Sequence, residues 1–177
     1  MNKNFRLVCI GLFVAQSLAL YLLEGLIPVP YLAPGAKLGI ANTVTLVTLY
    51  LLPDKKDTLL ILLVRILLSS LFGGGPSAFL YSVSGALSAF LIMLVLKEYG
   101  RNYFSLPGIS AAGAVFHHIG QLLTAMLLLH TTALLFYLPI LTAIGIFTGL
   151  LTGFVARWLL DHLQKLPLAA RFLSMRS

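Results

Sequence analysis

Seven polar side chains that could contact a ligand lie within otherwise apolar stretches of this 177-residue sequence. They are Gln16, Glu24, Asn42, Arg65, His117, His118 and Gln121. Arg65 is the most costly of these residues to place in a membrane. The free energy of inserting an arginine in the middle of a membrane helix is unfavourable by about 2.5–3.5 kcal/mol unless the side chain faces a partner or water. Its guanidinium fork matches the paired oxygens of a carboxylate or phosphate, so it is a candidate anion contact. An internal ion pair, or hydrogen bonds to helix carbonyls, is the alternative.

The spacing of His117 and Gln121 places both on one face of a helix, because they are four residues apart. Together with Asn42 and Arg65 they are candidates to line one cavity. The adjacent His118 points about 100° away from His117 and is poorly placed to share a metal ion with it. We therefore expect no metal site and no cofactor. A neutral histidine bonded to a neighbouring helix is the alternative for both histidines.

Motifs for catalysis are missing from the sequence. It contains no H-E-x-x-H and no G-x-x-x-x-G-K-[ST] motif, and no D-D-x-x-D motif for the magnesium ions of prenyl diphosphate chemistry. Of the 5 acidic residues, only Glu24 lies in an apolar stretch, near its outer end, where we expect water to solvate it. These observations favour a binding or transport protein over an enzyme. An accessory role beside a separate prenyl synthase stays open.

The elements that hold these side chains must be membrane helices. Hydrophobic residues make up 59% of the chain and charged residues 10%, and the mean hydropathy is +1.00, which is too apolar for a soluble domain of this size. Apolar runs separated by Pro, Gly or charge predict one all-α domain, residues 1–177, that is a six-transmembrane-helix bundle. The expected helices cover residues 7–26, 38–52, 58–72, 78–96, 109–129 and 134–160, and a tail covers residues 161–177.

Basic residues predict the orientation of these helices. Of the 12 Lys and Arg, all but Lys37 and Arg65 fall near the two ends of the chain or in the gaps after the second and fourth helices. Short loops rich in Lys and Arg stay in the cytoplasm, so we expect both termini to be cytoplasmic, in a bacterial inner membrane. The net charge of +7 then indicates contact with membrane lipids, not with nucleic acid.

Two segments on the opposite side are rich in Pro and Gly and are not expected to form regular helix. Residues 28–39 contain three prolines, and residues 73–76 read Gly-Gly-Gly-Pro. At membrane depth such backbone is tolerated only where it is buried in protein or lines a cavity. We therefore expect a cavity that opens outward, with Lys37 beside it. A pair of tight turns is the alternative.

Small residues form two further patterns. Gly145, Gly149 and Gly153 recur every four residues along the last helix and predict close helix packing inside the bundle. Ala15 and Ala19 form a weaker pair of the same spacing on the first helix. That pair could contact another helix of this chain or a separate partner.

Three stretches of the sequence resemble the Gx transporter family, which is often labelled heptaprenyl diphosphate synthase component I. They are P-G-A-K-L-G-I-A-N at residues 34–42, R-I-L-L-S-S-L-F-G-G-G-P at residues 65–76 and S-G-A-L-S at residues 84–88. The likeness extends over nearly the whole chain. That family is similar to the substrate-binding S components of energy-coupling factor (ECF) transporters, which are six-helix membrane proteins.

The resemblance implies an outward cavity that is covered by the loop after the first helix. By position, Pro34, Gly35 and Gly39 would belong to this lid loop. The resemblance also implies that small residues on the first helix, here Ala15 and Ala19, dock to a transmembrane coupling subunit that is driven by two ATPases.

Two hypotheses from different classes follow. The first is a substrate-binding subunit for the uptake of a small, anionic or vitamin-like molecule, with Lys37, Asn42, Arg65, His117 and Gln121 as the substrate-binding residues. The second is a noncatalytic membrane partner of a prenyl synthase in heptaprenyl diphosphate or menaquinone synthesis.

Overall fold

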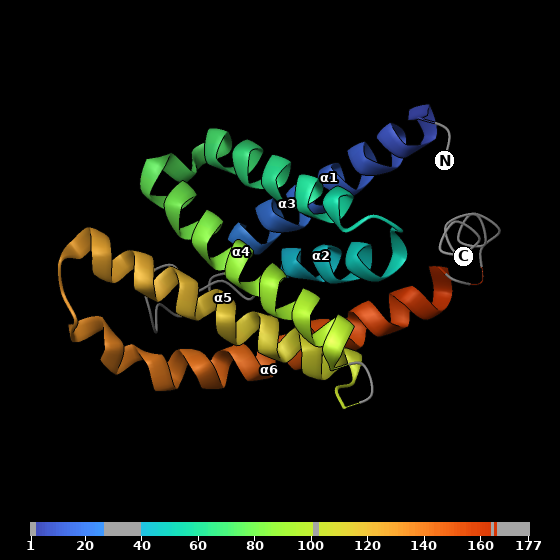
Figure 1. Cartoon of the computed structure of the whole chain (residues 1–177). Coiled ribbons are helices and arrows are strands. Elements are labelled where there is room, and N and C mark those ends of the chain that lie inside the picture. Colours follow the sequence, from blue (N-terminus) through green and yellow to red (C-terminus); the bar gives the residue numbers. More distant parts are fainter. Residues whose placement is uncertain (1–2, 27–39, 101–102, 164, 166–177) are drawn as a thin grey trace.

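The computed structural model is all α-helical, as the sequence predicts (Figure 1). The structure describes residues 3–26, 40–100, 103–163 and 165. Within these residues the α-helices are α1 Lys3–Leu26, α2 Ile40–Leu51, α3 Lys55–Ser69, α4 Gly75–Tyr99, α5 Leu106–Leu129 and α6 Leu138–Leu163. A π-helical turn, η1 Ser70–Gly74, joins α3 to α4, and a 3-10 turn, η2 Ala133–Tyr137, precedes α6.

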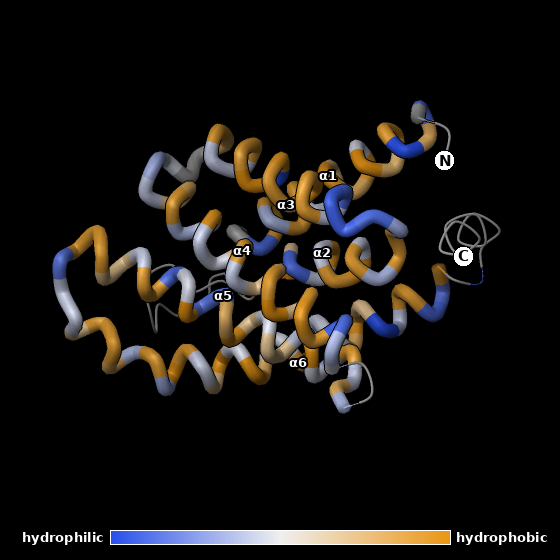
Figure 2. The backbone as a smooth tube through the Cα atoms, viewed as in Figure 1, coloured by the Kyte–Doolittle hydropathy of each residue, from blue (hydrophilic) through white to orange (hydrophobic). Residues whose placement is uncertain are grey.

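Apolar surface covers the outside of the bundle, as expected for a protein in lipid. Among the described residues, 4 helical segments are long and apolar enough to cross a membrane: Asn4–Glu24, Gly75–Tyr99, Leu106–Leu129 and Ala133–Leu163. Leu12 on α1 is 65% exposed and Phe154 on α6 is 59% exposed. Apolar residues predominate along most of the backbone in Figure 2. The chain is therefore a multi-pass membrane protein.

The short helix α2 lies at the centre of the bundle (Figure 1). Of its 12 residues, all but Ile40, Asn42 and Tyr50 are buried, and it contacts α1, α3 and α6. The buried Thr48 hydroxyl is satisfied within the helix, because it donates to the Val44 carbonyl at 2.8 Å. A helix that is apolar on all sides is stable where protein surrounds it. This position explains why so short a helix is tolerated within a membrane protein.

Two helices, α3 and α5, begin before their apolar runs because a capping residue precedes each of them. The Asp54 side chain accepts a hydrogen bond from Lys56 N at 2.9 Å, and the Ser105 hydroxyl accepts one from Gly108 N at 3.3 Å. Such caps satisfy amide groups that the first helical turn leaves without partners. For this reason α3 and α5 begin three residues before the ranges expected from hydropathy. The last helix, α6, likewise continues to Leu163, into the segment assigned to the tail.

The glycine-rich turn between α3 and α4 departs from α-helical geometry, as its composition predicts. Residues 70–74 form the π-helical turn η1, and Gly75 has φ +66° and ψ 174°. This conformation is available almost only to glycine. The turn reverses the chain so that α3 and α4 form a hairpin (Figure 1). The other irregular segment, residues 28–39, lies outside the described residues.

Helix α6 packs closely on α5 through the predicted glycine stripe. A Cβ atom on Gly149 would lie 2.5 Å from Ala111 Cα, and one on Gly153 would lie 2.5 Å from Pro107 Cα. Glycine is therefore required for the two backbones to approach so closely. The stripe is an internal packing surface.

A second close contact, between α5 and α4, was not predicted from the sequence. A Cβ atom on Gly120 would lie 2.6 Å from the Ser84 carbonyl oxygen, and one on Gly113 would lie 2.7 Å from Met93 Cγ. These two glycines are seven residues apart, so no four-residue repeat marks them. Helices α4, α5 and α6 consequently pack as one layer.

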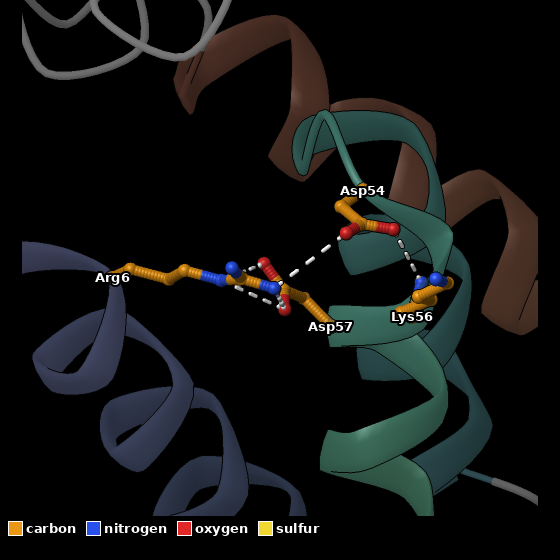
Figure 3. A network of polar contacts seen from close by, with 4 residues as sticks. All are labelled: Arg6, Asp54, Lys56 and Asp57. Atoms are coloured by element: carbon orange, nitrogen blue, oxygen red, sulfur yellow. Dashed lines mark hydrogen bonds and ion pairs between the residues drawn. The ribbon is translucent and has the colours of Figure 1, made fainter. Parts of the chain in front are cut away.

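Charged residues hold the helices together at the end of the bundle where α1 and α3 begin (Figure 3). The Arg6 Nε donates to Asp57 Oδ2 at 2.9 Å, and its Nη2 lies 3.5 Å from Asp54 Oδ2. Asp57 is only 2% exposed. Lys55 forms an ion pair with Glu98 near the end of α4. The network therefore links α1, α3 and α4 at one end.

Candidate functional site

A polar cavity lies among α1–α5, where α1 ends and where α2 and α4 begin. Its volume is about 110 Å³, which is room for several water molecules or a compact ligand, since one water needs about 10–15 Å³. The lining residues come from five helices. They are Tyr21, Glu24, Ala41, Asn42, Arg65, Ala78, Tyr81, Ser82, His117 and Gln121.

The structure brings four of the predicted substrate-binding residues together around this cavity. Asn42 is at the start of α2, Arg65 on α3, and His117 and Gln121 are one turn apart on α5. The fifth, Lys37, lies outside the described residues, as do the predicted lid residues Pro34, Gly35 and Gly39. The shared location agrees with the helical-face argument. Substrate binding by these residues stays a prediction.

Arg65 points into the bundle, as its cost in lipid requires. The residue is 5% exposed, and its Nε–H has no hydrogen-bond partner among the residues that the structure describes. Leaving a buried donor unsatisfied costs about 1–3 kcal/mol. The guanidinium also interacts electrostatically with Glu24 and Tyr21. Arg65 thus has an internal counter-charge and a donor that a ligand acceptor could satisfy.

Glu24 is part of the cavity, and the expectation that water solvates it at the surface was wrong. It is 4% exposed and lines the cavity beside Tyr21, one turn earlier on α1. It is buried although it is near the end of its apolar run. Charge balance could have identified it, because a buried arginine needs an acid and Glu24 is the only acid in an apolar stretch.

Sequence reasoning also missed the contribution of α4 to the cavity. Ala78, Tyr81 and Ser82 are spaced by one helical turn and line its wall. Tyrosine and serine are common in membrane helices, so their types alone gave no signal. Their spacing next to the Gly-Gly-Gly-Pro turn was the available clue.

The two adjacent histidines face different neighbours, as the 100° rotation per residue predicts. His117 lines the cavity, whereas His118 packs toward α6, where a Cβ atom on Gly145 would lie 3.0 Å from His118 Cδ2. Their ring centroids are 6.0 Å apart with an interplanar angle of 78°. In the described part of the chain, no three His, Cys, Asp or Glu residues group together in a way that could hold a metal ion.

Close packing of α4 on α5 fixes the position of His117 and Gln121. A Cβ atom on Gly85 would lie 2.8 Å from Gln121 Cγ and 3.0 Å from His117 Cε1. One turn further on, the Thr124 hydroxyl donates to Ser84 Oγ at 2.6 Å. Glycine on one helix and a hydrogen bond between the two helices therefore hold this wall of the cavity in place.

The predicted docking residues Ala15 and Ala19 are exposed on the outer face of α1. Gly11, one turn before Ala15, has open space where a Cβ atom would be. Gln16 is also exposed. The predicted pair therefore does not pack against another described helix of this chain, and its contact with a partner stays a prediction.

These features define a class: a multi-pass helical membrane protein with an internal polar cavity that contains one buried arginine and one buried glutamate. More particularly, the chain belongs to the heptaprenyl diphosphate synthase component I family, whose family model matches residues 13–159. The match extends from α1 to α6. No match was found among the curated proteins or among the solved structures.

Proposed function

We propose that this protein is a membrane-embedded substrate-binding subunit for the uptake of a small molecule, similar in role to the S components of ECF transporters. One observation carries the proposal, namely the cavity in which Asn42, Arg65, His117 and Gln121 meet. Ionisable groups inside a membrane protein are costly and mark ligand or ion sites. A concave site with a few convergent polar groups is the usual form of a small-molecule site. Such a subunit binds its substrate without transforming it, so we propose no catalytic residue.

We also propose that both termini are cytoplasmic and that the cavity opens to the outside. Support comes from the placement of charge, because Lys55, Lys56 and Lys97 lie at the end of the bundle away from the cavity. Short basic loops stay in the cytoplasm. In this orientation the loop that contains Pro34, Gly35 and Gly39 would cover the cavity, and Lys37 would lie beside its entrance.

A transmembrane helix of a coupling subunit is the partner that we propose for the outer face of α1. Gly11, Ala15 and Ala19 recur every four residues there, which allows a second helix to approach closely. The exposed amide of Gln16 is adjacent to this stripe, and an amide in lipid is stabilised when another helix supplies a hydrogen bond. ATPases that bind the coupling subunit would supply the energy for uptake.

A ligand screen tests the binding function. The purified protein is heated with small anionic and vitamin-like compounds, and Tm is compared between wild type, Arg65→Ala and Arg157→Ala. We expect a bound compound to raise the Tm of wild type and Arg157→Ala by about 3 °C or more, and that of Arg65→Ala by much less. Arg157 is a matched control because it is exposed on α6, away from the cavity.

If Arg65→Ala does not fold, Asn42→Ala can replace it in the screen. The Asn42 variant removes a half-buried polar group and leaves the charges of Arg65 and Glu24 in place. It should weaken the compound's effect on Tm. If no compound stabilises wild type and Arg65→Ala only unfolds, Arg65 has a structural role and the binding function is wrong.

Co-purification tests the docking surface. Ala15→Leu and Ala19→Leu add bulk to the stripe and should abolish recovery of the coupling subunit and ATPases, while ligand-induced changes in Tm persist. Ala143→Leu is the control, because Ala143 is exposed on a different helix, α6. Equal recovery with all three variants would place the partner on another surface.

The family description favours one alternative, a noncatalytic membrane partner of a prenyl synthase that makes heptaprenyl diphosphate for menaquinone. The sequence has no D-D-x-x-D motif, so the catalytic carboxylates would belong to that second protein. The same co-purification separates the two functions. A recovered prenyl synthase favours the alternative, a recovered coupling subunit with ATPases favours uptake, and recovery of neither weakens both.

A further inference from the structure

The charges of the cavity balance each other. Arg65 is 5% exposed and Glu24 is 4% exposed, both line the cavity, and they interact electrostatically. The other described lining residues are uncharged when His117 is counted as neutral. The described lining residues therefore contribute one positive group and one negative group, and these two charges cancel.

This balance restricts the ligand. A simple anion bound at Arg65 would place a second negative charge near Glu24 and leave the buried site with a net negative charge, which is costly in a medium of low dielectric constant. A simple cation at Glu24 would leave a net positive charge for the same reason. A ligand with both charges adds no net charge to the described lining residues.

The hydrogen-bonding groups agree with the charges. An ionised glutamate only accepts hydrogen bonds and an arginine only donates them, and the Arg65 Nε–H has no partner among the described residues. A matching ligand must therefore carry an acceptor at one end and a donor at the other. The amide groups of Asn42 and Gln121 both donate and accept, so they can contact either end.

We propose that the cavity binds a compact zwitterion, with its acidic group at Arg65 and its ammonium-type group at Glu24. This inference rests on the proposed binding function and narrows its ligand from anions to zwitterions. A cavity volume of about 110 Å³ admits only a short spacer between the two charged groups.

Three matched sets of probes test the proposal in thermal unfolding of the purified full-length protein at equal ionic strength. The zwitterions are glycine, β-alanine and γ-aminobutyrate, the anions are acetate, propionate and butyrate, and the cations are methylamine, ethylamine and propylamine. At least one zwitterion should raise Tm by about 3 °C or more at millimolar concentration, and more than its matched anion and amine do. An anion that stabilises the protein as much as the best zwitterion overturns the proposal, as does the absence of any zwitterion effect.

Two near-isosteric variants change the charge of the cavity in opposite directions. Glu24→Gln gives the cavity a net positive charge and should shift the preference to the carboxylates, whereas Gln121→Glu gives it a net negative charge and should shift the preference to the amines. Arg157→Gln removes an exposed charge on α6, outside the cavity lining, and should keep the preference for zwitterions. If one charge variant does not fold, the other still decides, because an unchanged preference in a folded charge variant contradicts the proposal.

The result is separable from the uptake function. Zwitterion binding without recovery of a coupling subunit would support the cavity assignment and contradict uptake. Recovery of the coupling subunit together with a ligand that is a simple anion would support uptake and contradict the zwitterion.

Discussion

At the scale of single residues, the described part of the chain contains three buried charged side chains, Asp57, Arg65 and Glu24, in two different surroundings. Asp57 is 2% exposed and is held by two groups of Arg6, a side chain that is 44% exposed. Arg65 and Glu24 both line the cavity and interact electrostatically. The first pair links α1 to α3 at the end of the bundle, and we expect it to stabilise the fold. The second pair lies at the candidate binding site.

Arg6→Gln should lower the Tm of the protein in detergent by several degrees, because it leaves the Asp57 carboxylate buried without its cationic partner. The double variant Arg6→Gln with Asp57→Asn should regain part of this loss, since it removes the buried charge as well. Lys56→Gln, a change at an exposed cation next to Asp57, is the control and should leave Tm nearly unchanged. A double variant that is less stable than the sum of its two single changes would contradict this interpretation.

The sequence predicted that Asn42, Arg65, His117 and Gln121 meet, but it missed Glu24 and the residues that α4 contributes to the cavity. Arg65 had to face inward, and the four-residue spacing of His117 and Gln121 placed them on one face. Glu24 was misjudged because distance along an apolar run does not show how neighbouring helices cover a helix end. The volume of the cavity depends on how five helices pack, and hydropathy does not encode that packing.

At the scale of helices, glycine has opposite effects on the two sides of the bundle. On α6 it allows contact with α5, and Gly149 has no room for a Cβ atom. On α1, a Cβ atom added to Gly11 would meet nothing within 4 Å, so this glycine makes no such internal contact. Glycine spacing alone predicts a helix contact, but it does not tell whether the partner belongs to the same chain.

Gly149→Ala should destabilise the isolated protein by about 1–3 kcal/mol, because the new methyl group would overlap the Ala111 backbone and push α5 and α6 apart. Gly11→Ala should be neutral or stabilising by up to about 1 kcal/mol, since alanine favours a helix more than glycine does. Unfolding of both variants in one detergent, by heat or denaturant, measures the difference. Equal losses would show that the glycines on α6 do not govern its packing.

The helices themselves were largely predictable, and their ends were not. Apolar runs located the helices, whereas the caps at Asp54 and Ser105 started α3 and α5 earlier than hydropathy indicated. The central helix α2 is too short to span a membrane by itself. It is tolerated because other helices of the bundle bury it. Composition correctly predicted irregular backbone at residues 73–74, which form part of a π-helical turn, but it was wrong for Pro76, which lies in the first turn of α4.

At the scale of the whole molecule, the ion pairs between helices and the cavity lie toward opposite ends of the bundle. Arg6, Lys55 and Glu98 form ion pairs at the end where α3 begins and α4 ends. The cavity is formed where α1 ends and α4 begins. The positive-inside rule predicts that the end with the ion pairs is cytoplasmic. The side of the membrane to which the cavity opens can therefore be tested separately from its ligand.

Labelling of single cysteines in intact cells tests this orientation. In a Cys9→Ala background, Thr132→Cys, after α5, should react with a membrane-impermeant thiol reagent. Tyr103→Cys, before α5, should react only after the membrane is permeabilised. Both native side chains are exposed, so access is not limited by burial. The reverse pattern would direct the cavity to the cytoplasm and contradict uptake.

The layer of α4, α5 and α6 would restrict how the proposed ligand could reach the cavity. At Gly120, Gly149 and Gly153 the backbone of α5 lies so close to that of α4 or α6 that a Cβ atom would not fit. Little free volume therefore remains for one of these helices to slide past its neighbour. For the proposed ligand, the atoms that make way would therefore belong mainly to α1, α2 and α3. If the proposed binding function holds, α4, α5 and α6 would stay in place during ligand entry, and the helices that carry Glu24, Asn42 and Arg65 would move.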